Sequence, residues 1–496
     1  MIDHILQQLT YNPDAPLIFS SGLFLFLFLG FTFCYMLMQH TRTLRLLFVT
    51  AFSYYFYYKS SGFYFFLLAI VTLSDYFIAK AIARTKANSS DASGVAARWL
   101  VALSLIIDLG LLAYFKYTNF FAGMWAQMVG ANFQPWDIFL PVGISFFTFQ
   151  SMSYVIDVYR GDLKPLPSLL DYAFYVSFFP QLVAGPIVRA RDFAPQIRKP
   201  LEITQEMFAR GVFFIMIGLF KKAVISDYIS LNFVDRIFDN PTLYSGVENL
   251  LGAYGYAMQI YCDFSGYSDM AIGIALLLGF RFPMNFNAPY TSQSITDFWR
   301  RWHISLSSWI RDYIYISLGG NRRGKVRQYV NLIITMLLGG LWHGASLNFV
   351  AWGGMHGMAL AIHKWMREHL FHHDKHYVSH GIRRVLAVLL TFHFVVFCWI
   401  FFRNHTFDAS WTMICKIFTD FHPELFLQVV TSYWVVFAMI LFGYVTHFIP
   451  ERWTEGCVCI IQKGGVLLGA LLIAAVIYMV IQIKSSEIQP FIYFQF

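Results

Sequence analysis

Long apolar runs separated by short polar stretches fill the chain from end to end. A helix needs about 20 apolar residues to cross a bilayer, and several of these runs are too short or too polar to cross alone. The pattern therefore predicts an all-α polytopic membrane protein with about 10 to 13 transmembrane or re-entrant helices. The runs lie near residues 16–37, 45–59, 62–83, 98–116, 137–158, 168–187, 205–225, 249–280, 328–350, 351–365, 383–403, 424–449 and 465–483.

The composition supports a membrane protein. Hydrophobic residues make up 57% of the 496 residues and charged residues only 13%, and the mean hydropathy is +0.54. A soluble domain has about 25% charged residues, because polar groups must cover its surface. The six cysteines form no CxxC pair and lie mostly in apolar runs. The composition excludes a disordered chain, a coiled coil and a disulfide scaffold.

Basic residues gather in the loops between the apolar runs. The net charge is +8, and the cytoplasmic loops of membrane proteins are rich in Lys and Arg. Arg42 and Arg45 follow the first run, which predicts a cytoplasmic loop there and a periplasmic N-terminus. No nucleic-acid-binding module is visible, so we expect the lipid bilayer and no nucleic acid as a partner.

The most basic loop spans residues 297–327. Two interpretations stay open for it: the charges set the topology alone, or they form a docking surface for an anionic cytoplasmic donor, such as a nucleotide-bearing thioester. Asp297 and Asp312 are its acidic residues, and its candidates for donor docking are Arg300, Arg301, Arg311, Arg322 and Arg323.

Ionisable residues within apolar runs are costly, so they are candidates for function. His343 is one of them, in the stretch Leu337–Ser346. Two glycines precede it, and small residues follow, which would let a ligand or another helix approach the imidazole closely. An imidazole with a pKa near neutrality suits general-base chemistry. From these residues alone, a catalytic base and a buried structural histidine are equally good interpretations.

Three tryptophans surround a second histidine, His303. If 298–309 is one helix, Trp299, Trp302 and Trp309 form an interfacial aromatic stripe on it. Such a segment would lie at the cytoplasmic interface or dip into the membrane. By itself this pattern favours a residue of the polar face over a catalytic one for His303.

Two carboxylates, Asp263 and Asp269, interrupt another apolar run. They are six residues apart and face different directions on a helix, so they cannot act as one carboxylate pair. Hydrogen bonding between helices is the favoured interpretation.

A polar stretch near residue 370 is rich in histidine. Some of its histidines have i,i+4 spacing, which binds metal in some helices, but the ligands of a closed site are missing. We expect a solvated loop and no metal. The histidines are His363, His369, His372, His373, His376 and His380.

The loops suggest a division into three parts. We expect N-terminal transmembrane helices in 1–136, a catalytic core in 137–365 with the basic re-entrant segment 297–327, and C-terminal helices with an aromatic tail in 366–496. That tail includes Tyr493, and anchoring at the interface is its simplest role.

Several motifs together resemble the membrane-bound O-acyltransferase family, in the bacterial branch of alginate O-acetyltransferase and teichoic-acid D-alanyl transferase. The resemblance covers essentially the whole chain, and its length and N-terminal Phe-rich run favour the alginate-type branch. The most specific motifs are Pro141–Gln150, Phe178–Pro186, Asp263–Asp269, Trp299–Asp312 and Trp342–Gly344.

The resemblance implies the fold of that family, with helices around a central tunnel, and an acyltransferase activity. The family's membrane-buried histidine matches His343, and its upstream residue, Asn or His, matches His303. His343 would act as general base on an acceptor hydroxyl, and His303 would orient the donor or stabilise the oxyanion. Supporting or tunnel positions would be Asp263, Asp269, Ser265, Trp342 and Ser346.

The resemblance also implies a reaction across the bacterial inner membrane. The donor substrate would be cytoplasmic acetyl-CoA or another acyl thioester, with no bound cofactor. Acetyl would pass to a periplasmic polysaccharide acetyltransferase for O-acetylation of an exopolysaccharide such as alginate, with Tyr493 as a possible acyl relay. The alternatives are acyl transfer from a carrier protein to a cell-wall polymer, as with D-alanine, and a non-enzymatic polysaccharide transporter or scaffold.

Overall fold

The computed structural model describes residues 7–13, 15–87, 94–371 and 379–483. Every regular element within these ranges is a helix, and none of them contains a strand, which confirms the predicted all-α class. Tyr493 and the histidines His372, His373 and His376 lie outside the described residues.

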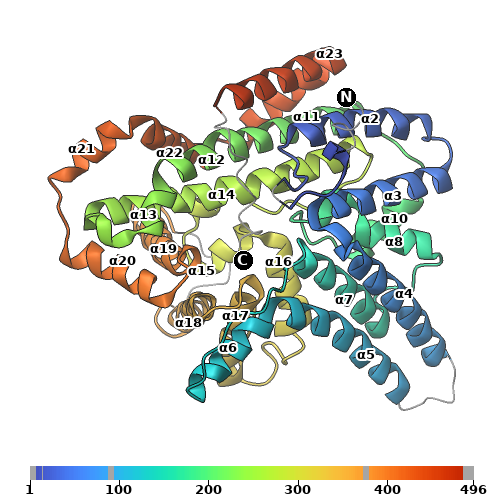
Figure 1. Cartoon of the computed structure of the whole chain (residues 1–496), viewed down its shortest axis with the longest axis horizontal. Coiled ribbons are helices and arrows are strands. Elements are labelled where there is room, and N and C mark those ends of the chain that lie inside the picture. Colours follow the sequence, from blue (N-terminus) through green and yellow to red (C-terminus); the bar gives the residue numbers. More distant parts are fainter. Residues whose placement is uncertain (1–6, 14, 88–93, 372–378, 484–496) are drawn as a thin grey trace. The chain divides into compact units, whose positions relative to one another are not determined.

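The chain divides into two compact units, which are labelled by element in Figure 1. Unit 1 comprises Met1–Ile215 and Met270–Pro283, and unit 2 comprises Met216–Asp269 and Met284–Phe496. Helices α11 (Gln205–Leu219) and α14 (Gly246–Leu277) contribute residues to both. The other elements of unit 1 are α2 (Gly22–Leu37), α3 (Arg42–Ser61), η1 (Gly62–Tyr64), α4 (Phe65–Ala87), α5 (Val95–Leu112), η2 (Ala113–Tyr117), α6 (Thr118–Met128), α7 (Ile144–Arg160), α8 (Leu169–Ser177), α9 (Phe179–Leu182) and α10 (Ala190–Arg198).

Unit 1 is built around aromatic side chains. Helices α4, α5 and α7 pack against one another, and the Phe179 ring contacts those of Phe31 and Phe52 at centroid distances of 5.4 and 5.1 Å. Such pairs stabilise a core beyond the burial of their apolar area.

One of the motifs that carry the family resemblance has a packing reason. Gly143 precedes α7 with a φ of +74°, which favours glycine. A Cβ on Gly143 would lie only 2.6 Å from the carbonyl oxygen of Leu182. The motif Pro141–Gln150 therefore packs directly on the backbone of the motif Phe178–Pro186.

Unit 2 carries most of the candidate chemistry. Several short helices precede and follow α14 along the chain, and longer helices come after them. Its elements are η3 (Phe220–Ser226), α12 (Asp227–Ile229), η4 (Ser230–Val234), α13 (Asp235–Asp239), η5 (Pro241–Leu243), η6 (Pro289–Thr291), α15 (Ile295–Arg301), α16 (Ile304–Ile310), η7 (Arg311–Tyr315), α17 (Lys325–His343), α18 (Leu347–His369), α19 (Gly381–Arg403), α20 (Phe407–Thr419), α21 (Leu425–Ser432), α22 (Trp434–Thr446) and α23 (Glu451–Ile483).

Within the described residues, four helical segments are long and apolar enough to cross a membrane. A fifth span arises if α21 and α22, which meet at 89°, count as one. The larger predicted number also includes helices that are shorter or more polar than a single span requires. The four segments are Arg42–Ala87, Val95–Met128, Gly381–Arg403 and Glu451–Gln482.

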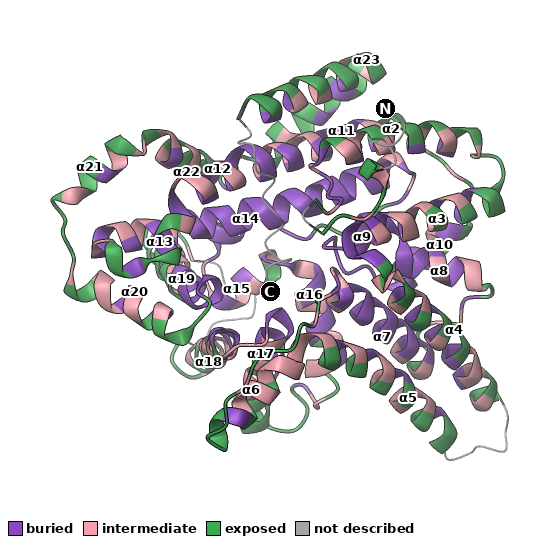
Figure 2. Ribbon diagram, in the orientation of Figure 1, coloured by how far each residue is buried: buried purple, intermediate pink, exposed green. Residues whose placement is uncertain are grey.

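The outer faces of these helices expose large apolar side chains. Figure 2 shows α23 largely exposed and α5 mixed between exposed and intermediate, whereas α14 is buried along most of its length. Leu390 and Leu467 are 76% and 74% exposed. Soluble monomers rarely expose apolar surface on this scale, so the pattern fits contact with lipid.

Candidate active site

His343 is the last residue of α17 and is 3% exposed. Its imidazole is surrounded by aromatic rings, with centroid distances of 5.0 Å to Trp342, 5.1 Å to Trp352 and 5.1 Å to Phe402. A cage of rings around a polar group restricts its motion and excludes water, which are both useful for a catalytic histidine.

Glycines bring α17 and α18 close together beside His343. A Cβ on Gly340 would lie 2.2 Å from the carbonyl oxygen of Phe349, and one on Gly353 would lie 2.4 Å from that of Met336. The small residues near His343 thus admit a second helix, one of the two partners expected from the sequence. Ser346, a predicted tunnel residue, precedes the first turn of α18.

His303 lies at a break between two short helices, α15 and α16. Its backbone has a φ of +44°, a left-handed conformation that few residues other than glycine adopt. Residues 298–309 therefore do not form one helix, the condition for the aromatic stripe considered from the sequence, because the chain turns at this residue. Trp302 and Trp309 are buried instead of forming an interfacial stripe.

Asn285 holds the His303 turn in place. Its side-chain oxygen Oδ1 lies 3.1 Å from Nδ1 of His303 and accepts hydrogen bonds from the backbone N–H and the hydroxyl of Ser305. Its backbone carbonyl accepts a hydrogen bond from Ile304 N–H at 2.9 Å. A single buried asparagine thereby fixes three consecutive residues.

The two histidines meet at one indole ring. Trp342 lies 6.3 Å from the His303 ring and 5.0 Å from the His343 ring, measured between centroids. The chain brings them together although they are forty positions apart, because η7 packs against both α16 and α17. Trp342, a predicted tunnel residue, is thus central to the site.

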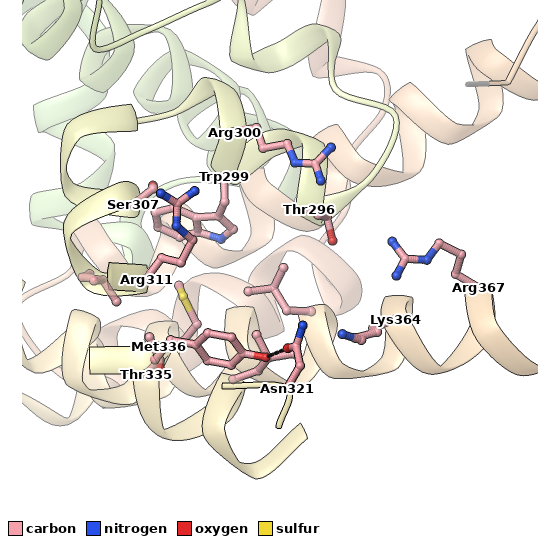
Figure 3. Close-up of a pocket in the computed structure, with 14 residues that line it drawn as sticks. Thr296, Trp299, Arg300, Ser307, Arg311, Asn321, Thr335, Met336, Lys364 and Arg367 are labelled. Carbon is pink, nitrogen blue, oxygen red and sulfur yellow. Dashed lines mark hydrogen bonds between the residues drawn. The ribbon is translucent and has the colours of Figure 1, made fainter. Parts of the chain in front are cut away.

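A cavity of about 350 Å³ opens within unit 2 next to this site. Figure 3 shows cationic side chains from α15, η7 and α18 around it. No carboxylate lines the cavity among the described residues, so its charge is positive and suits an anion such as a phosphate. Its polar and charged lining is Thr296, Arg300, Ser307, Arg311, Tyr315, Asn321, Thr335, Lys364 and Arg367.

Two tryptophan rings connect the cavity to His343. Trp299 lines the cavity and lies 5.7 Å from Trp352, which lies 5.1 Å from His343. The indole N–H of Trp299 donates a hydrogen bond to Nδ1 of buried His356 at 3.3 Å. The wall between the cavity and the histidine is therefore aromatic and held in one orientation.

The predicted docking arginines separate into two groups. Arg300 and Arg311 line the cavity, whereas Arg322, Arg323 and Arg301 do not. Arg301 forms an ion pair with Asp297 at 2.9 Å. Arg311 donates two hydrogen bonds to the carboxylate of Asp312, which raises the pKa of the Arg311 guanidinium.

Sequence reasoning missed three residues of this region: Lys364 and Arg367 in the cavity, and Asn285. His356, behind the cavity, is one of the ionisable residues within apolar runs that the sequence marks as candidates. Lys364 and Arg367 are three residues apart on α18, so they share a helix face, and that spacing is visible in the sequence. The packing of α18 against α15, which brings them to the cavity, is not.

The carboxylates of α14 form ion pairs with neighbouring lysines. Asp263 Oδ1 lies 2.5 Å from Lys222 Nζ, and Asp269 Oδ2 lies 2.8 Å from Lys221 Nζ. Each carboxylate faces a different lysine of η3, in agreement with their different directions on the helix. The two carboxylates therefore make contacts between helical segments, which is the interpretation favoured from the sequence. Ser265, the third candidate on this helix, lies between the two aspartates in the sequence and is buried.

Comparison with known proteins places this geometry in a family. The family model described as membrane-bound O-acyltransferase matches residues 108–401, which include both histidines and Asn285. A probable alginate O-acetylase of Pseudomonas syringae is 43% identical over 81% of this chain and 75% of its own length. A peptidoglycan O-acetyltransferase of Helicobacter pylori is 37% identical over 79% of this chain and 78% of its own length.

A more distant relative is the teichoic acid D-alanyltransferase of Bacillus subtilis. It is 32% identical over 54% of this chain and 69% of its own length. These relatives are all acyltransferases by name, and the family model covers more than half of the chain. The chain therefore belongs to the membrane-bound O-acyltransferase family and is a membrane O-acyltransferase.

Proposed function

We propose that the chain moves an acetyl group from a cytoplasmic thioester across the bacterial inner membrane, for O-acetylation of an exopolysaccharide such as alginate. The observation that carries the proposal is the cationic cavity that two tryptophan rings, Trp299 and Trp352, connect to His343. An anionic donor and a proton-accepting group are the two requirements of such a transfer.

The cavity supports a donor with phosphate groups. Arg300 has no ion-pair partner among the described residues, and Lys364 and Arg367 share Glu368 at the long distance of 3.9 Å. Arg300 therefore has its charge available for a ligand, and Lys364 and Arg367 add positive charge to the lining of the cavity. Acetyl-CoA carries phosphates on its nucleotide, so the thioester could lie toward the aromatic wall while the phosphates stay among the cations.

His343, which lies beyond the aromatic wall of Trp299 and Trp352, would act as the base in the reaction. The oxygen of an acceptor hydroxyl attacks the thioester carbonyl carbon, and the carbon–sulfur bond breaks. The proton of the hydroxyl passes to the His343 imidazole and then to the leaving thiolate, so the products are an ester and a free thiol. General-base help of this kind contributes about 10²- to 10⁴-fold in rate.

The orientation and the partners are part of the same proposal. Basic loops in the cytoplasm and a periplasmic N-terminus follow from Arg42 and Arg45. The acetyl group would then reach a periplasmic polysaccharide acetyltransferase, with Tyr493 as an acyl relay. The names of the relatives, alginate O-acetylase and peptidoglycan O-acetyltransferase, support acetyl transfer to extracellular polymers.

A second candidate is D-alanyl transfer from a carrier protein. The D-alanyltransferase relative supports it, at the lower identity of 32%. The cationic cavity would accept the phosphate of a carrier's phosphopantetheine arm as well as that of coenzyme A. The two candidates therefore differ in the donor and the acyl group, and donor competition separates them.

The test uses inside-out membrane vesicles and radiolabelled acetyl-CoA. Wild type is compared with His343→Ala and with His393→Ala, which removes an exposed histidine from α19. We expect label on the protein or in the lumen for wild type and His393→Ala, and its loss in folded His343→Ala. Equal label in all three would contradict a role of His343 in transfer. Label in none would point to a carrier protein as donor.

A further inference from the structure

The side-chain oxygen of Asn285 can be identified from its neighbours. The backbone N–H of Ser305 can only donate, and it points to Oδ1 at 3.2 Å. The amide nitrogen Nδ2 donates to the hydroxyl oxygen of Ser268 at 3.1 Å. Exchanging the oxygen and the nitrogen would place two donors against each other, so the hydrogen-bond network fixes the orientation of this amide.

That oxygen determines which nitrogen of His303 carries hydrogen. Nδ1 lies 3.1 Å from Oδ1, and an amide oxygen cannot donate, so Nδ1 must carry the N–H. A neutral imidazole has only one N–H, which leaves Nε2 with a lone pair. His303 is fully buried, and burial favours the uncharged ring.

The lone pair at Nε2 meets no hydrogen-bond donor in the part of the chain that the structure describes. Nε2 is buried and has no hydrogen-bond partner among the described residues. The ring packs edge-on against Phe264 at 4.6 Å and near Trp342 at 6.3 Å. A buried acceptor without a partner is costly, so its presence indicates a ligand that supplies a hydrogen.

The backbone shows that this arrangement is enforced. His303 has a φ of +44°, and Asn285 accepts hydrogen bonds from the next two backbone N–H groups, those of Ile304 and Ser305. Backbone strain persists only where the surroundings impose it, and it concentrates at functional sites. Asn285 thus fixes both the ring and the turn that carries it.

We infer that Asn285 is a positioning residue, which holds His303 in the tautomer whose Nε2 accepts a hydrogen. Applied to the reaction, the inference rests on the proposed acyl transfer. Nε2 would accept a hydrogen bond from another donor group of the acceptor, while His343 takes the proton of the attacking hydroxyl, and would so direct the attacking oxygen toward the thioester carbon. This tautomer has no N–H at Nε2 to stabilise an oxyanion, the second role suggested by the family resemblance.

The tautomer itself can be measured without any turnover. Protein with ¹⁵N-labelled histidine rings, purified without a histidine tag, is placed in lipid nanodiscs for NMR. The difference between wild type and His303→Ala isolates one of the 15 histidines. We expect a protonated Nδ1 and an unprotonated Nε2. A protonated Nε2 in wild type would overturn the inference, whatever the vesicle assay shows.

Variants of Asn285 then test what holds the tautomer. Asn285→Leu removes the acceptor and should give a mixture of tautomers and a turnover lower by about 10- to 100-fold, with the donor KM unchanged. Ser268→Ala removes only the partner of Nδ2 and should lose less. A folded Asn285→Leu with the wild-type spectrum and turnover would contradict the inference.

Asn285→Asp gives an answer even if Asn285→Leu does not fold. A carboxylate still accepts from Nδ1, so the wild-type tautomer should remain. It also favours the imidazolium, so the pKa of His303 should rise and the acid limb of the pH–rate profile should move to higher pH. An unmoved profile, with transfer itself intact, would show that Asn285 has only a structural role.

Discussion

Two buried polar clusters of unit 2 differ in what their side chains contact. In the lysine–aspartate cluster, Lys222 lies 2.5 Å from Asp263 and 2.7 Å from Asp227, and Lys221 lies 2.8 Å from Asp269. In the Asn285–His303 cluster, the polar contacts of the imidazole are at Nδ1, and Nε2 has no hydrogen-bond partner among the described residues.

The difference separates structural from chemical groups. The sequence does not separate the two clusters, because each contains ionisable side chains among apolar and aromatic neighbours. Charges that neutralise one another inside the fold have little left for a substrate, and breaking such a pair is costly. A buried lone pair without a partner has the opposite property. We therefore assign the first cluster to stability and the second to the reaction.

The largest effect on stability is expected for Lys222→Met. It would leave Asp263 and Asp227 without their buried cation and destabilise the fold by about 3–5 kcal/mol. Unfolding in mixed SDS and dodecyl maltoside micelles measures this loss. Lys222→Arg keeps the charge and should lose much less. If Lys222→Met unfolds at the same SDS fraction as wild type, the lysine–aspartate cluster does not stabilise the fold, and the two clusters do not differ in the way described.

A smaller effect is expected where α17 and α18 touch. Gly353→Ala would place a Cβ 2.4 Å from the carbonyl oxygen of Met336, and the overpacking should cost about 1–3 kcal/mol. Because α17 ends at His343, turnover should fall as well.

The neighbouring glycine supplies the matched control. A Cβ on Gly354 would meet only the Leu337 side chain, at an ordinary 3.5 Å. Gly354→Ala should therefore stay within about 0.5 kcal/mol of wild type. Equal losses for the two alanine variants in unfolding and turnover assays would show that close helix packing does not position His343.

The smallest effect is expected in the cationic cavity. The double variant Arg300→Gln/Arg311→Gln should raise the KM for acetyl-CoA about three- to tenfold and weaken its salt dependence, because these side chains are largely exposed to solvent. Arg322→Gln/Arg323→Gln removes the same charge outside the cavity and should change KM less. Equal changes of KM in the two double variants would show that the net charge matters and that the position of the arginines in the cavity does not.

The fold class and the burial of His343 were predictable from the sequence. Apolar runs predicted an all-helical membrane protein, and His343 was a candidate because an ionisable residue in such a run is rare. The opposite directions of Asp263 and Asp269 followed from helix geometry alone. These features depend on local pattern, so no tertiary contact was needed to predict them.

Other features depend on contacts between distant segments. Asn285 is an ordinary loop residue in the sequence, and only folding brings it to His303. The spacing of the tryptophans was compatible with one helix through Trp302, because a left-handed turn at His303 leaves no signature in a histidine. Lys364 joins the cavity only because α18 packs on α15. Long-range packing therefore decides which polar groups meet a substrate.

The most direct test measures turnover per folded molecule and stability in parallel, for His303→Ala and Lys222→Met. We predict that the two substitutions have opposite effects, one mainly on turnover and the other mainly on stability. His303→Ala should lose about 10²- to 10⁴-fold in turnover with the smaller loss of stability, and Lys222→Met should lose stability while its folded fraction stays within a few-fold of wild-type turnover. Full turnover in His303→Ala, or an inactive folded fraction of Lys222→Met, would contradict the division of the two clusters.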